Sequence, residues 1–487
     1  MLSTVGRVAR NSIAVIGALL IKRATNLVLF VLIARHLGVL AFGQFSLVYT
    51  FYIIFQVSAA FGLANLIARE VAKDKSDLDK YLLNGHFIVL LASLISLAVW
   101  ILMIHLLDYS QEVVRASYLL GLALIPFTMS KVCEAIFQAY ERMQFMTYAF
   151  GLANLTKIGL VWLLLSQGYG LMHIIGLLVI IQTAMLLMEW GFISRYFSKP
   201  SWTIDLAFCR KLARVSITFL GIGLFTVIFL RLNIIILSKF RGETDVGLYN
   251  AAFQLTYVFM LISMSLKQAV YPVLSRTYTA NLAKFKQYSE RSIEFLMSIA
   301  FPLAVYFFFL ANSILLIYKK DFVAAGPTMQ VLGWMLVPMS FSRILGSILM
   351  ASGRQRSNLV IAMVNTASLL ILSLVLIHYF GLIGAGVALL ASHVISFILH
   401  YSLVTGQIFR ISIPRMIWKP GVASLIMAGV LMLIGRDQGL SLLIPSTAII
   451  YVAVLLSLNF LFGGPFKSMK IGMLVGRTEP EIPGTET

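Results

Sequence analysis

The sequence predicts an all-α integral membrane protein with fourteen transmembrane helices, arranged as two six-helix lobes plus two extra C-terminal helices. Three observations support this fold class. Of the 487 residues, 60% are hydrophobic and only 12% are charged, and the mean hydropathy is +0.93. Soluble domains carry about 45–50% apolar and about 25% charged residues. Apolar segments long enough to cross a bilayer recur along the chain, and the first six resemble the next six.

A membrane-crossing helix needs about 20 mostly apolar residues, and the sequence offers fourteen such segments. We place them at residues 12–34, 42–66, 83–105, 117–140, 147–167, 171–193, 213–237, 248–274, 292–317, 327–352, 357–379, 383–408, 420–436 and 441–463. These segments are too long and too evenly apolar to be strands of a membrane barrel. The first one lacks a small-residue cleavage site, so we expect an uncleaved helix rather than a signal peptide.

The distribution of Lys and Arg predicts the orientation of these segments, because cytoplasmic loops are enriched in positive charge. The chain carries 38 Lys and Arg against 19 Asp and Glu, a net charge of +19. With the N-terminus inside, 24 of the 38 cations fall in cytoplasmic segments and 7 in outer ones. We therefore expect a protein of the cell membrane with both termini in the cytoplasm. Its cytoplasmic cations are expected to meet anionic membrane lipids, and nucleic acid is not an expected partner of so hydrophobic a chain.

An internal repeat relates the first six spans to the next six. Gly38 and Gly43 follow the first span, and Gly242 and Gly247 follow the seventh at a shift of 204 residues. A second match relates a proline-containing segment of the fourth span to one in the tenth. Because each repeat contains an even number of spans, both copies have the same orientation in the membrane. This arrangement predicts two lobes related by a parallel pseudo-two-fold axis along the membrane normal.

The repeat and the span positions together predict the division of the chain. The expected parts are a first lobe at 1–194 (helices 1–6), a cytoplasmic linker at 195–212, a second lobe at 213–409 (helices 7–12), two further helices at 410–466 and a cytoplasmic tail at 467–487. The last two helices lie outside the repeat.

Seven cations fall inside the predicted spans. They are Lys22, Arg23, Lys131, Lys157, Arg231, Lys267 and Arg343. A cation at a helix centre costs about 2.5–3.5 kcal/mol on insertion scales, so seven facing lipid would cost on the order of 20 kcal/mol. Most of these side chains must therefore face the bundle interior, a watery cavity or a partner.

An electropositive cavity between the lobes would suit an anionic group, phosphate above all. Ammonium and guanidinium groups replace the lost hydration of phosphate with charge-assisted hydrogen bonds. The residues expected to bind substrate there are Lys22, Arg23, Asn26, Arg231, Lys267, Lys131 and Arg343. One alternative is that Lys131 and Glu134, three residues apart on one helix face, neutralise each other. Another is that Lys157, Lys267 and Arg343 snorkel to lipid headgroups or form structural pairs.

The sequence carries no catalytic motif. It contains no Gly-x4-Gly-Lys-Ser/Thr loop, so we do not expect ATP hydrolysis by this chain. Cys133 and Cys209 form no metal-ligand spacing, and the seven His residues do not cluster. The outer loops are short and carry only scattered acidic residues, which argues against a membrane glycosyltransferase or polymerase with paired carboxylates. We expect a transporter rather than an enzyme, with no cofactor or metal and with the membrane potential or an ion gradient as its driving force.

Several motifs resemble those of a known family. They are the basic pair Lys22-Arg23, Ala34-Arg35-His-Leu-Gly38-x4-Gly43-Gln-Phe45, Gly242-x4-Gly247-Leu-Tyr249-Asn-Ala-Ala252, Tyr271-Pro272-Val-Leu-Ser-Arg276 and Ala351-Ser-Gly-Arg354. In these motifs, and over nearly its whole length, the chain resembles the lipid-linked oligosaccharide flippases of polysaccharide biosynthesis, within the multidrug/oligosaccharidyl-lipid/polysaccharide exporter superfamily. The resemblance implies two six-helix lobes, a V-shaped cationic central cavity and alternating access. Asn233 stands where such sequences often have an acidic residue. The last two spans resemble the extra pair of the related peptidoglycan-precursor flippase.

We therefore expect a flippase that moves a polyprenyl-diphosphate-linked oligosaccharide from the cytoplasmic to the outer leaflet. Its expected partners are the lipid-linked glycan and other polysaccharide-assembly proteins. One alternative is a multidrug or small-metabolite exporter of the same fold, although a cationic cavity would repel the cationic compounds that such exporters usually carry. A membrane glycosyltransferase or polymerase is a less favoured alternative, and a structural scaffold that has kept the transporter fold is another.

Overall fold

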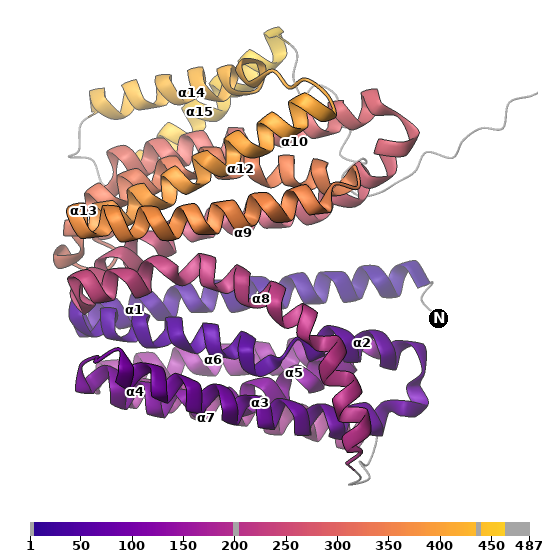
Figure 1. Cartoon of the computed structure of the whole chain (residues 1–487). Coiled ribbons are helices and arrows are strands. Elements are labelled where there is room, and N and C mark those ends of the chain that lie inside the picture. The colour runs from indigo at the N-terminus through magenta and orange to yellow at the C-terminus, as the bar shows by residue number, and fades with distance from the viewer. Residues whose placement is uncertain (1–3, 198–203, 435–439, 463–487) are drawn as a thin grey trace, which may run out of the picture. The chain divides into compact units, whose positions relative to one another are not determined.

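The computed structural model describes residues 4–197, 204–434 and 440–462, and every regular element in these ranges is helical (Figure 1). The α-helices are α1 (Thr4–Ala60), α2 (Leu63–Lys73), α3 (Leu78–Leu106), α4 (Gln111–Gly121), α5 (Leu124–Ala139), α6 (Gln144–Ser166), α7 (Leu171–Tyr196), α8 (Leu206–Arg241), α9 (Glu243–Ala280), α10 (Leu282–Phe309), α11 (Ala311–Leu315), α12 (Gly326–Ala351), α13 (Gln355–Gln407), α14 (Ile413–Ile434) and α15 (Leu440–Phe462). Two short 3-10 helices are η1 (Lys75–Asp77) and η2 (Lys320–Ala325). The predicted all-helical fold is confirmed over these ranges.

Twelve segments of the described chain are long and apolar enough to cross a membrane, which makes this a multi-pass membrane protein. Two of them, Thr25–Lys73 and Gln355–Gln407, contain 49 and 53 residues. About 20 residues suffice for one crossing, so each of these two segments is long enough for two. The sequence predicts fourteen spans by dividing both segments.

Each of the two long helices, α1 and α13, is interrupted at a single glycine. Gly38 in α1 has φ 79° and ψ −178°, and Gly381 in α13 has φ 56° and ψ −128°. Glycine adopts a positive φ at little cost, whereas a side chain would clash with the backbone there. Helical geometry therefore breaks at the two positions where the sequence predicts a turn between consecutive spans. Fourteen separate crossings remain a prediction.

The helices form two compact units, which we describe separately. Unit 1 contains Met1–Gln254, Leu315–Ala325 and Ser373–Ala385. Unit 2 contains Leu255–Ile314, Gly326–Leu372 and Gly386–Thr487. These units come from the packing of the chain, whereas the lobes predicted above come from the sequence repeat. The lobe boundaries remain predictions.

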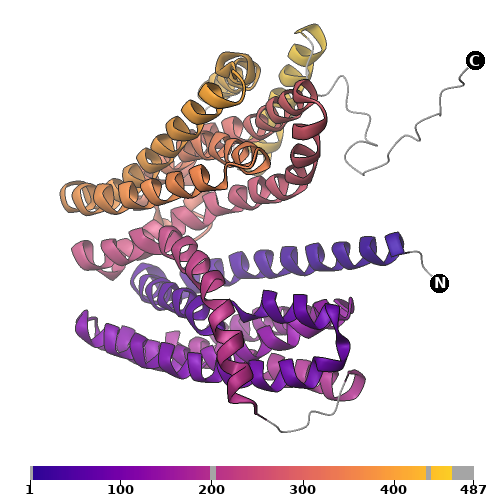
Figure 2. The same ribbon diagram turned by 45° about the vertical axis from the view of Figure 1, so that its right-hand side comes forward.

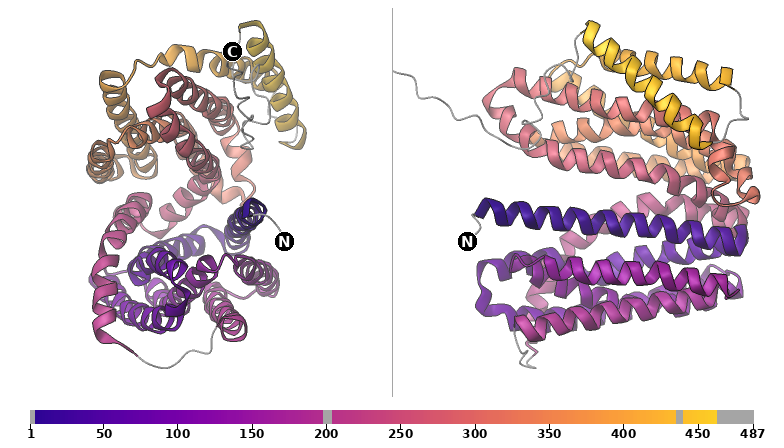
Figure 3. Two further views of the ribbon diagram at one scale, coloured as in Figure 1. Left: turned by 90° about the vertical axis from the view of Figure 1, so that its right-hand side faces the viewer. Right: turned by 180° about the vertical axis from the view of Figure 1, so that it is seen from behind.

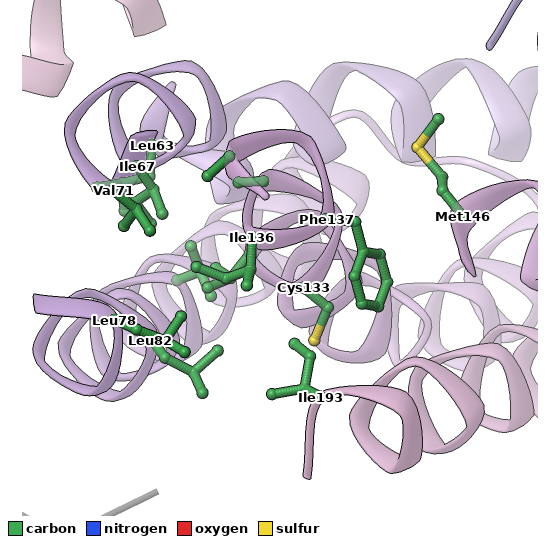
Figure 4. Packing of buried hydrophobic residues seen from close by; sticks show 14 of the residues in the cluster. Leu63, Ile67, Val71, Leu78, Leu82, Cys133, Ile136, Phe137, Met146 and Ile193 are labelled. Carbon is green, nitrogen blue, oxygen red and sulfur yellow. The ribbon is translucent and has the colours of Figure 1, made fainter. Parts of the chain in front are cut away.

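In unit 1, α1 packs against α3, α6 and α8, and Figure 3 shows its long N-terminal half running beside the helices drawn in purple. A second group of helices, α2, α3, α5 and α7, encloses an apolar core (Figure 4). Helix α2 is amphipathic, so that Leu63, Ile67 and Val71 face this core. Ile136 and Phe137 of α5 occupy its centre and are fully buried. Close van der Waals packing of this kind holds helices together within a membrane, where the lipid is as apolar as the core.

Replacing Phe137 by Ala should lower the free energy of unfolding by about 3–5 kcal/mol, because the cavity left behind cannot be filled. Leu187→Ala on α7 is the matched control, since that side chain is exposed. Thermal unfolding of the detergent-solubilised variants, followed by intrinsic fluorescence, measures the difference. Equal midpoints for the two variants would show that the core around Phe137 does not stabilise the protein.

In unit 2, α10 packs against α12 and α14, and α14 pairs with α15, as Figure 2 shows for the yellow helices. The hydroxyl of Tyr306 on α10 donates to the carbonyl oxygen of Ile444 at 3.0 Å. Lys419 of α14 is buried, with Nζ 3.7 Å from Oε1 of Glu294 and 3.2 Å from Oδ1 of Asn459. These polar contacts attach the two C-terminal helices to α10.

Candidate functional site

Unit 1 contains a polar cavity of about 310 Å³ between α1, α4, α5, α6 and α7. Its polar lining residues are Asn26, Tyr49, Tyr52, Gln56, Glu134, Asn154, Lys157 and Gln182. The volume lies at the lower end of the range of about 300–1,000 Å³ that small-molecule sites occupy. Polar and ionisable groups within membrane helices usually face a cavity and mark a substrate or ion pathway.

Lys157 of α6 reaches across to α1 within this cavity. Its Nζ donates to Oδ1 of Asn26 at 3.1 Å and to Oδ1 of Asn154 at 2.9 Å. The same Asn154 oxygen accepts a hydrogen bond from the hydroxyl of Thr25 at 3.1 Å. Both acceptors of the ammonium are neutral amides, so they solvate it without cancelling its charge. The network therefore ties α1 to α6 and keeps a positive charge at the cavity wall.

Lys131 of α5 forms an ion pair with Glu134 one turn away. Its Nζ lies 2.8 Å from Oε1 and 2.5 Å from Oε2 of this carboxylate. The ammonium also lies over the rings of Phe127 and Phe150, at 5.3 and 5.7 Å from their centroids. The low dielectric of the interior strengthens the attraction within the pair, and desolvation makes either partner costly to leave alone. The i,i+3 pairing that the sequence left open is thus formed in the structure.

A second cavity, of about 430 Å³, lies beside the first, because Gln56 and Phe127 line both. Lys131 and Asn65 contribute its other polar side chains. Gly223 of α8 also lines this second cavity. Lys131 is therefore open to this cavity on one side while it is paired with Glu134 on the other.

Unit 2 contains two of the predicted cations, Lys267 of α9 and Arg343 of α12. One guanidinium nitrogen of Arg343 lies 3.8 Å from the sulfur of Met339, and its buried Nε has no hydrogen-bond partner among the described residues. A guanidinium with an unsatisfied donor in a low-dielectric interior favours the binding of an anion, which can accept that hydrogen bond.

Unit 2 also contains a hydrogen-bonded histidine, His400 of α13. Its Nδ1 lies 2.7 Å from the carbonyl oxygen of Ser396, and its Nε2 lies 3.1 Å from Oδ1 of Asn358. The imidazole ring is thus held by partners at both of its nitrogens.

The predicted cation Arg231 lies on α8, two residues before Asn233. Nδ2 of Asn233 donates to the hydroxyl of Tyr249 at 3.1 Å and to the carbonyl oxygen of Ala385 at 2.9 Å. The hydroxyl of Ser373 donates to Oδ1 of Asn233 at 2.5 Å. This amide joins α8, α9 and α13 through neutral hydrogen bonds at the position where the resembled sequences often carry an acid.

The predicted site residues therefore fall into several local groups. Lys22 and Arg23 lie on the described backbone of α1, but their side chains lie outside the part that the structure describes. Asn26 binds a residue that the predicted set omits, Lys157. The structure does not test whether all seven predicted residues share one cavity, and that arrangement remains a prediction.

Sequence reasoning did not find the amide and phenol groups of the first cavity, namely Tyr49, Tyr52, Gln56 and Gln182. A signal was present for the cation, because Asn154 and Lys157 stand three residues apart in an otherwise apolar span. Polar residues at helical spacing within a span usually share a buried face. Among the residues that the structure describes, no group of three His, Cys, Asp or Glu side chains could hold a metal ion.

Comparison with known proteins places this chain among carbohydrate-related membrane proteins. The profile of the family described as "Polysaccharide biosynthesis protein" matches residues 8–278, and the MatE profile matches residues 218–376. The chain is similar to the probable low-salt glycan biosynthesis flippase Agl15 of Haloferax volcanii, with 23% identity over 429 residues that cover 87% of this chain and 89% of the relative. It is also similar to the capsular polysaccharide biosynthesis protein CapF of Staphylococcus aureus, with 20% identity over 56% of this chain and 70% of CapF.

Solved structures show which fold the helices adopt. The lipid II flippase MurJ, in an inward closed conformation, matches with a TM-score of 0.73 and 16% identity, covering 93% of this chain and 98% of that one. An inward-facing multidrug resistance MATE family transporter of the MOP superfamily matches with a TM-score of 0.66 and 16% identity, covering 79% and 94%. The chain therefore has the fold that these two kinds of transporter share.

Proposed function

Because the chain belongs to the polysaccharide biosynthesis protein family, we propose that it is a flippase for a polyprenyl-diphosphate-linked oligosaccharide. The substrate would move from the cytoplasmic to the outer leaflet of the cell membrane. The observation that carries this proposal is the guanidinium of Arg343 within a membrane helix, whose buried Nε has no hydrogen-bond partner among the described residues. A relative named as a glycan biosynthesis flippase and the fold of a lipid II flippase support the same function.

In this proposal the diphosphate binds to the cations of the membrane helices, and the lipid tail stays in the bilayer. The cationic central cavity is formed by Lys22, Arg23, Asn26, Arg231, Lys267, Lys131 and Arg343. The ion pair with Glu134 makes Lys131 the weakest anion ligand of this set, because its charge is already compensated. Lys157, solvated only by amides in the hydrogen bonds described above, joins the set.

We further infer that the protein works by alternating access as a transporter rather than as an enzyme. Two six-helix lobes and two extra helices would give fourteen crossings, with both termini in the cytoplasm. The breaks at Gly38 and Gly381 support this count, since each divides a segment of twice the necessary length. The membrane potential or an ion gradient would drive the cycle, and other polysaccharide-assembly proteins would supply and use the substrate.

A transport assay tests the proposal directly. The purified chain is reconstituted into vesicles that contain a fluorescent polyprenyl-diphosphate-linked disaccharide, and a membrane-impermeant reductant is added outside. Only outer-leaflet probe is bleached in protein-free vesicles, so about half of the signal should persist. Vesicles with the protein should lose nearly all of it, because the inner-leaflet probe becomes accessible.

The matched control is a probe with the same lipid and sugar but without the diphosphate. We expect it to flip at the rate of protein-free vesicles, since the buried cations have no anion to bind. Equal flipping of both probes, or flipping of neither, would contradict the proposed function.

A multidrug exporter of the same fold is the second candidate, favoured by the MatE match over residues 218–376 and by the MATE structure. Its usual cationic substrates would meet the positive charges of Lys157, Lys267 and Arg343. Efflux of a cationic dye by the same vesicles would support this candidate, and its absence would favour the flippase.

A further inference from the structure

Unit 1 contains a further cavity, of about 400 Å³, whose lining is apolar apart from one histidine. Helix α3 contributes Leu83, Phe87 and Leu90 to it, and α7 contributes Leu187 and Trp190. Leu187 is 66% exposed, so the cavity opens on the apolar surface that α7 turns outward. In a membrane-crossing helix such a surface faces lipid. The cavity therefore differs in chemistry from the two polar cavities described above, and it lies within reach of membrane lipid.

The walls of this cavity are fixed by contacts of their own. The rings of Trp190 and His86 meet edge-on, with centroids 5.0 Å apart. Nδ1 of the buried His86 lies 2.7 Å from the carbonyl oxygen of Leu82 one turn earlier on α3. Met129 of α5 also lines the cavity, and α5 packs against both α3 and α7. Three helices therefore hold the cavity in shape, as is usual for binding sites that are largely preformed.

The cavity extends along α3 for the depth of one leaflet. Lys80, Leu83, Phe87 and Leu90 recur at intervals of three, four and three residues, so they lie on one face of the helix. At about 1.5 Å of rise per residue, Leu90 lies about 15 Å beyond Lys80, which is half of the roughly 30 Å hydrocarbon core. The orientation predicted from Lys and Arg places Lys80 at the cytoplasmic end. The apolar lining is thus at the depth of the acyl chains of the cytoplasmic leaflet, and Lys80 is at the depth of their headgroups.

The rim at this end carries both signs of charge. Nζ of Lys80 lies 3.8 Å from Oδ2 of Asp205, and the two side chains are 46% and 48% exposed. Asp205 directly follows Ile204, which lines the cavity. The backbone N–H of Asp205 donates to Oδ1 of Asn84 at 2.8 Å, which holds this carboxylate beside α3. An ion pair so exposed is weak, so a ligand that brings both a negative and a positive group can replace it.

The second repeat shows what the same place on its own helices holds. Met129 is equivalent to Phe341 at a shift of 212 residues, and Trp190 is equivalent to Tyr401 at a shift of 211. In unit 2 these two counterparts belong to an apolar cluster that includes Met416, in the first turn of α14. Helix α14 lies outside the repeat, and the described part of unit 1 has no helix of this kind. Lipid is therefore the apolar material that unit 1 meets at this place.

We propose that this cavity, which we call the α3–α7 pocket, binds a phospholipid of the cytoplasmic leaflet with a phosphoethanolamine headgroup. One acyl chain lies along Leu83, Phe87 and Leu90, Lys80 binds the phosphate, and Asp205 binds the ammonium. Charged side chains at the cytoplasmic ends of membrane helices commonly recognise lipid headgroups.

The paired charges of the rim determine which headgroup fits. A primary ammonium donates three N–H groups to a carboxylate, whereas the trimethylammonium of choline has none to donate. A glycerol headgroup brings no positive charge to Asp205. The pocket therefore prefers phosphatidylethanolamine to phosphatidylcholine and to phosphatidylglycerol. It is separate from the substrate site, and it goes beyond the proposed function.

Photo-labelling tests where the acyl chain lies. The full chain in detergent micelles is irradiated with a phosphatidylethanolamine that carries a diazirine in its acyl chain, and labelled peptides are mapped by mass spectrometry. Labels should map to residues 83–90 of α3 and 186–190 of α7. Leu90→Trp, which fills the pocket, should reduce the labelling to the level seen with excess unlabelled lipid. Leu94→Trp is the matched control, because Leu94 is one turn further along α3, 47% exposed and outside the lining. If Leu90→Trp does not fold, Leu187→Trp at the exposed mouth replaces it.

Competition by unlabelled lipids tests the headgroup. Phosphatidylethanolamine should displace the photo-lipid at a concentration about 5- to 10-fold lower than phosphatidylcholine with the same chains, because only its ammonium can form a charge-assisted hydrogen bond. Asp205 also caps α8 by accepting from the backbone N–H of Phe208 at 2.9 Å. Asp205→Asn keeps this cap but removes the charge, so the two lipids should then compete equally. Lys80→Gln should weaken both. Glu290→Gln, in the exposed pair with Lys286 on α10, should leave the preference unchanged.

Several results would overturn this assignment. Labels that map outside both helices, or full labelling of a folded Leu90→Trp variant, would place the acyl chain elsewhere. Phosphatidylglycerol that competes as well as phosphatidylethanolamine would show that Asp205 does not select the headgroup. No labelling of either helix at any lipid concentration would show that protein, and not lipid, fills the pocket. None of these measurements depends on flipping, so they test the pocket separately from the proposed function.

Discussion

Replacing Arg343 by Ala is expected to reduce flipping of the diphosphate probe by about 10- to 100-fold. A hydrogen bond to a charged group contributes about 1.5–3 kcal/mol, and each 1.4 kcal/mol is a factor of about ten. The guanidinium can supply such a bond to phosphate, because its Nε has no hydrogen-bond partner among the described residues. The reconstituted assay above measures the effect as an initial rate.

The same substitution should leave the thermal unfolding midpoint unchanged or raise it. In the wild type, Arg343 holds its charge within a membrane helix, where its buried Nε has no partner among the described residues, and removal of the charge relieves this desolvation cost. A gain in stability with a loss of activity is typical of residues that are held in place for function. A fall in stability that parallels the loss of flipping would instead assign Arg343 a structural role.

Two further substitutions complete this test. Arg343→Lys keeps the positive charge but lacks the planar guanidinium with its several N–H donors. It should therefore retain part of the flipping activity. Arg115→Ala removes a cation from an exposed position on α4 and should leave flipping unchanged. Equal losses in Arg343→Ala and Arg115→Ala would show that flipping responds to total charge and not to this site.

A large electrostatic effect on stability is expected at Glu134. Glu134→Ala leaves the ammonium of Lys131 without its carboxylate, and the free energy of unfolding should fall by about 2–3 kcal/mol. Loss of one partner of a fully buried pair costs about 3–5 kcal/mol. The cost is smaller here because a quarter of the Lys131 side chain remains exposed, at 25% against 7% for Glu134. Thermal unfolding in detergent measures the change.

A double substitution and a second ion pair provide the controls for Glu134. Lys131→Met combined with Glu134→Met removes both charges and should restore most of the lost stability. On α10, Lys286 and Glu290 form a more exposed pair at 3.9 Å. Glu290→Ala should change the free energy of unfolding by less than about 1 kcal/mol. A destabilisation by Glu290→Ala as large as that by Glu134→Ala would contradict the burial argument.

The fold could be predicted from the sequence where the signal is local. Runs of about twenty apolar residues identified the membrane helices, and Gly38 and Gly381 fall in the predicted turns after the first and eleventh spans. The sequence did not reveal that Gly38 and Gly381 alone interrupt otherwise continuous helices. A residue's φ angle depends on how the flanking helices pack, and composition does not report it.

The candidate site, like the fold, was predictable only where its contacts are local in the sequence. The ion pair of Lys131 and Glu134 could be foreseen because both residues lie on one helix, three positions apart. The contact of Lys157 with Asn26 could not, since these residues are 131 positions apart and meet only because α6 packs on α1. Single cations stand out against apolar neighbours, whereas their partners are set by tertiary packing.

In unit 1, a Cβ atom on Gly43 of α1 would collide with the carbonyl oxygen of Glu243, and one on Gly247 of α9 would collide with that of Val39. This reciprocal crossing of equivalent glycines has a consequence for how such a chain can change over time. Two identical half-length chains that assemble around a two-fold axis would make the same contact. In that dimer every substitution occurs twice, once on each side of the axis. A single chain that contains both repeats is free of this restriction. At equivalent positions of its two repeats it has Ser46 and Asn250, and Val39 and Glu243. Glu243 stands where the first repeat has Val39, and its hydrogen bonds to Gln44 and Ser110 have no counterpart at that valine.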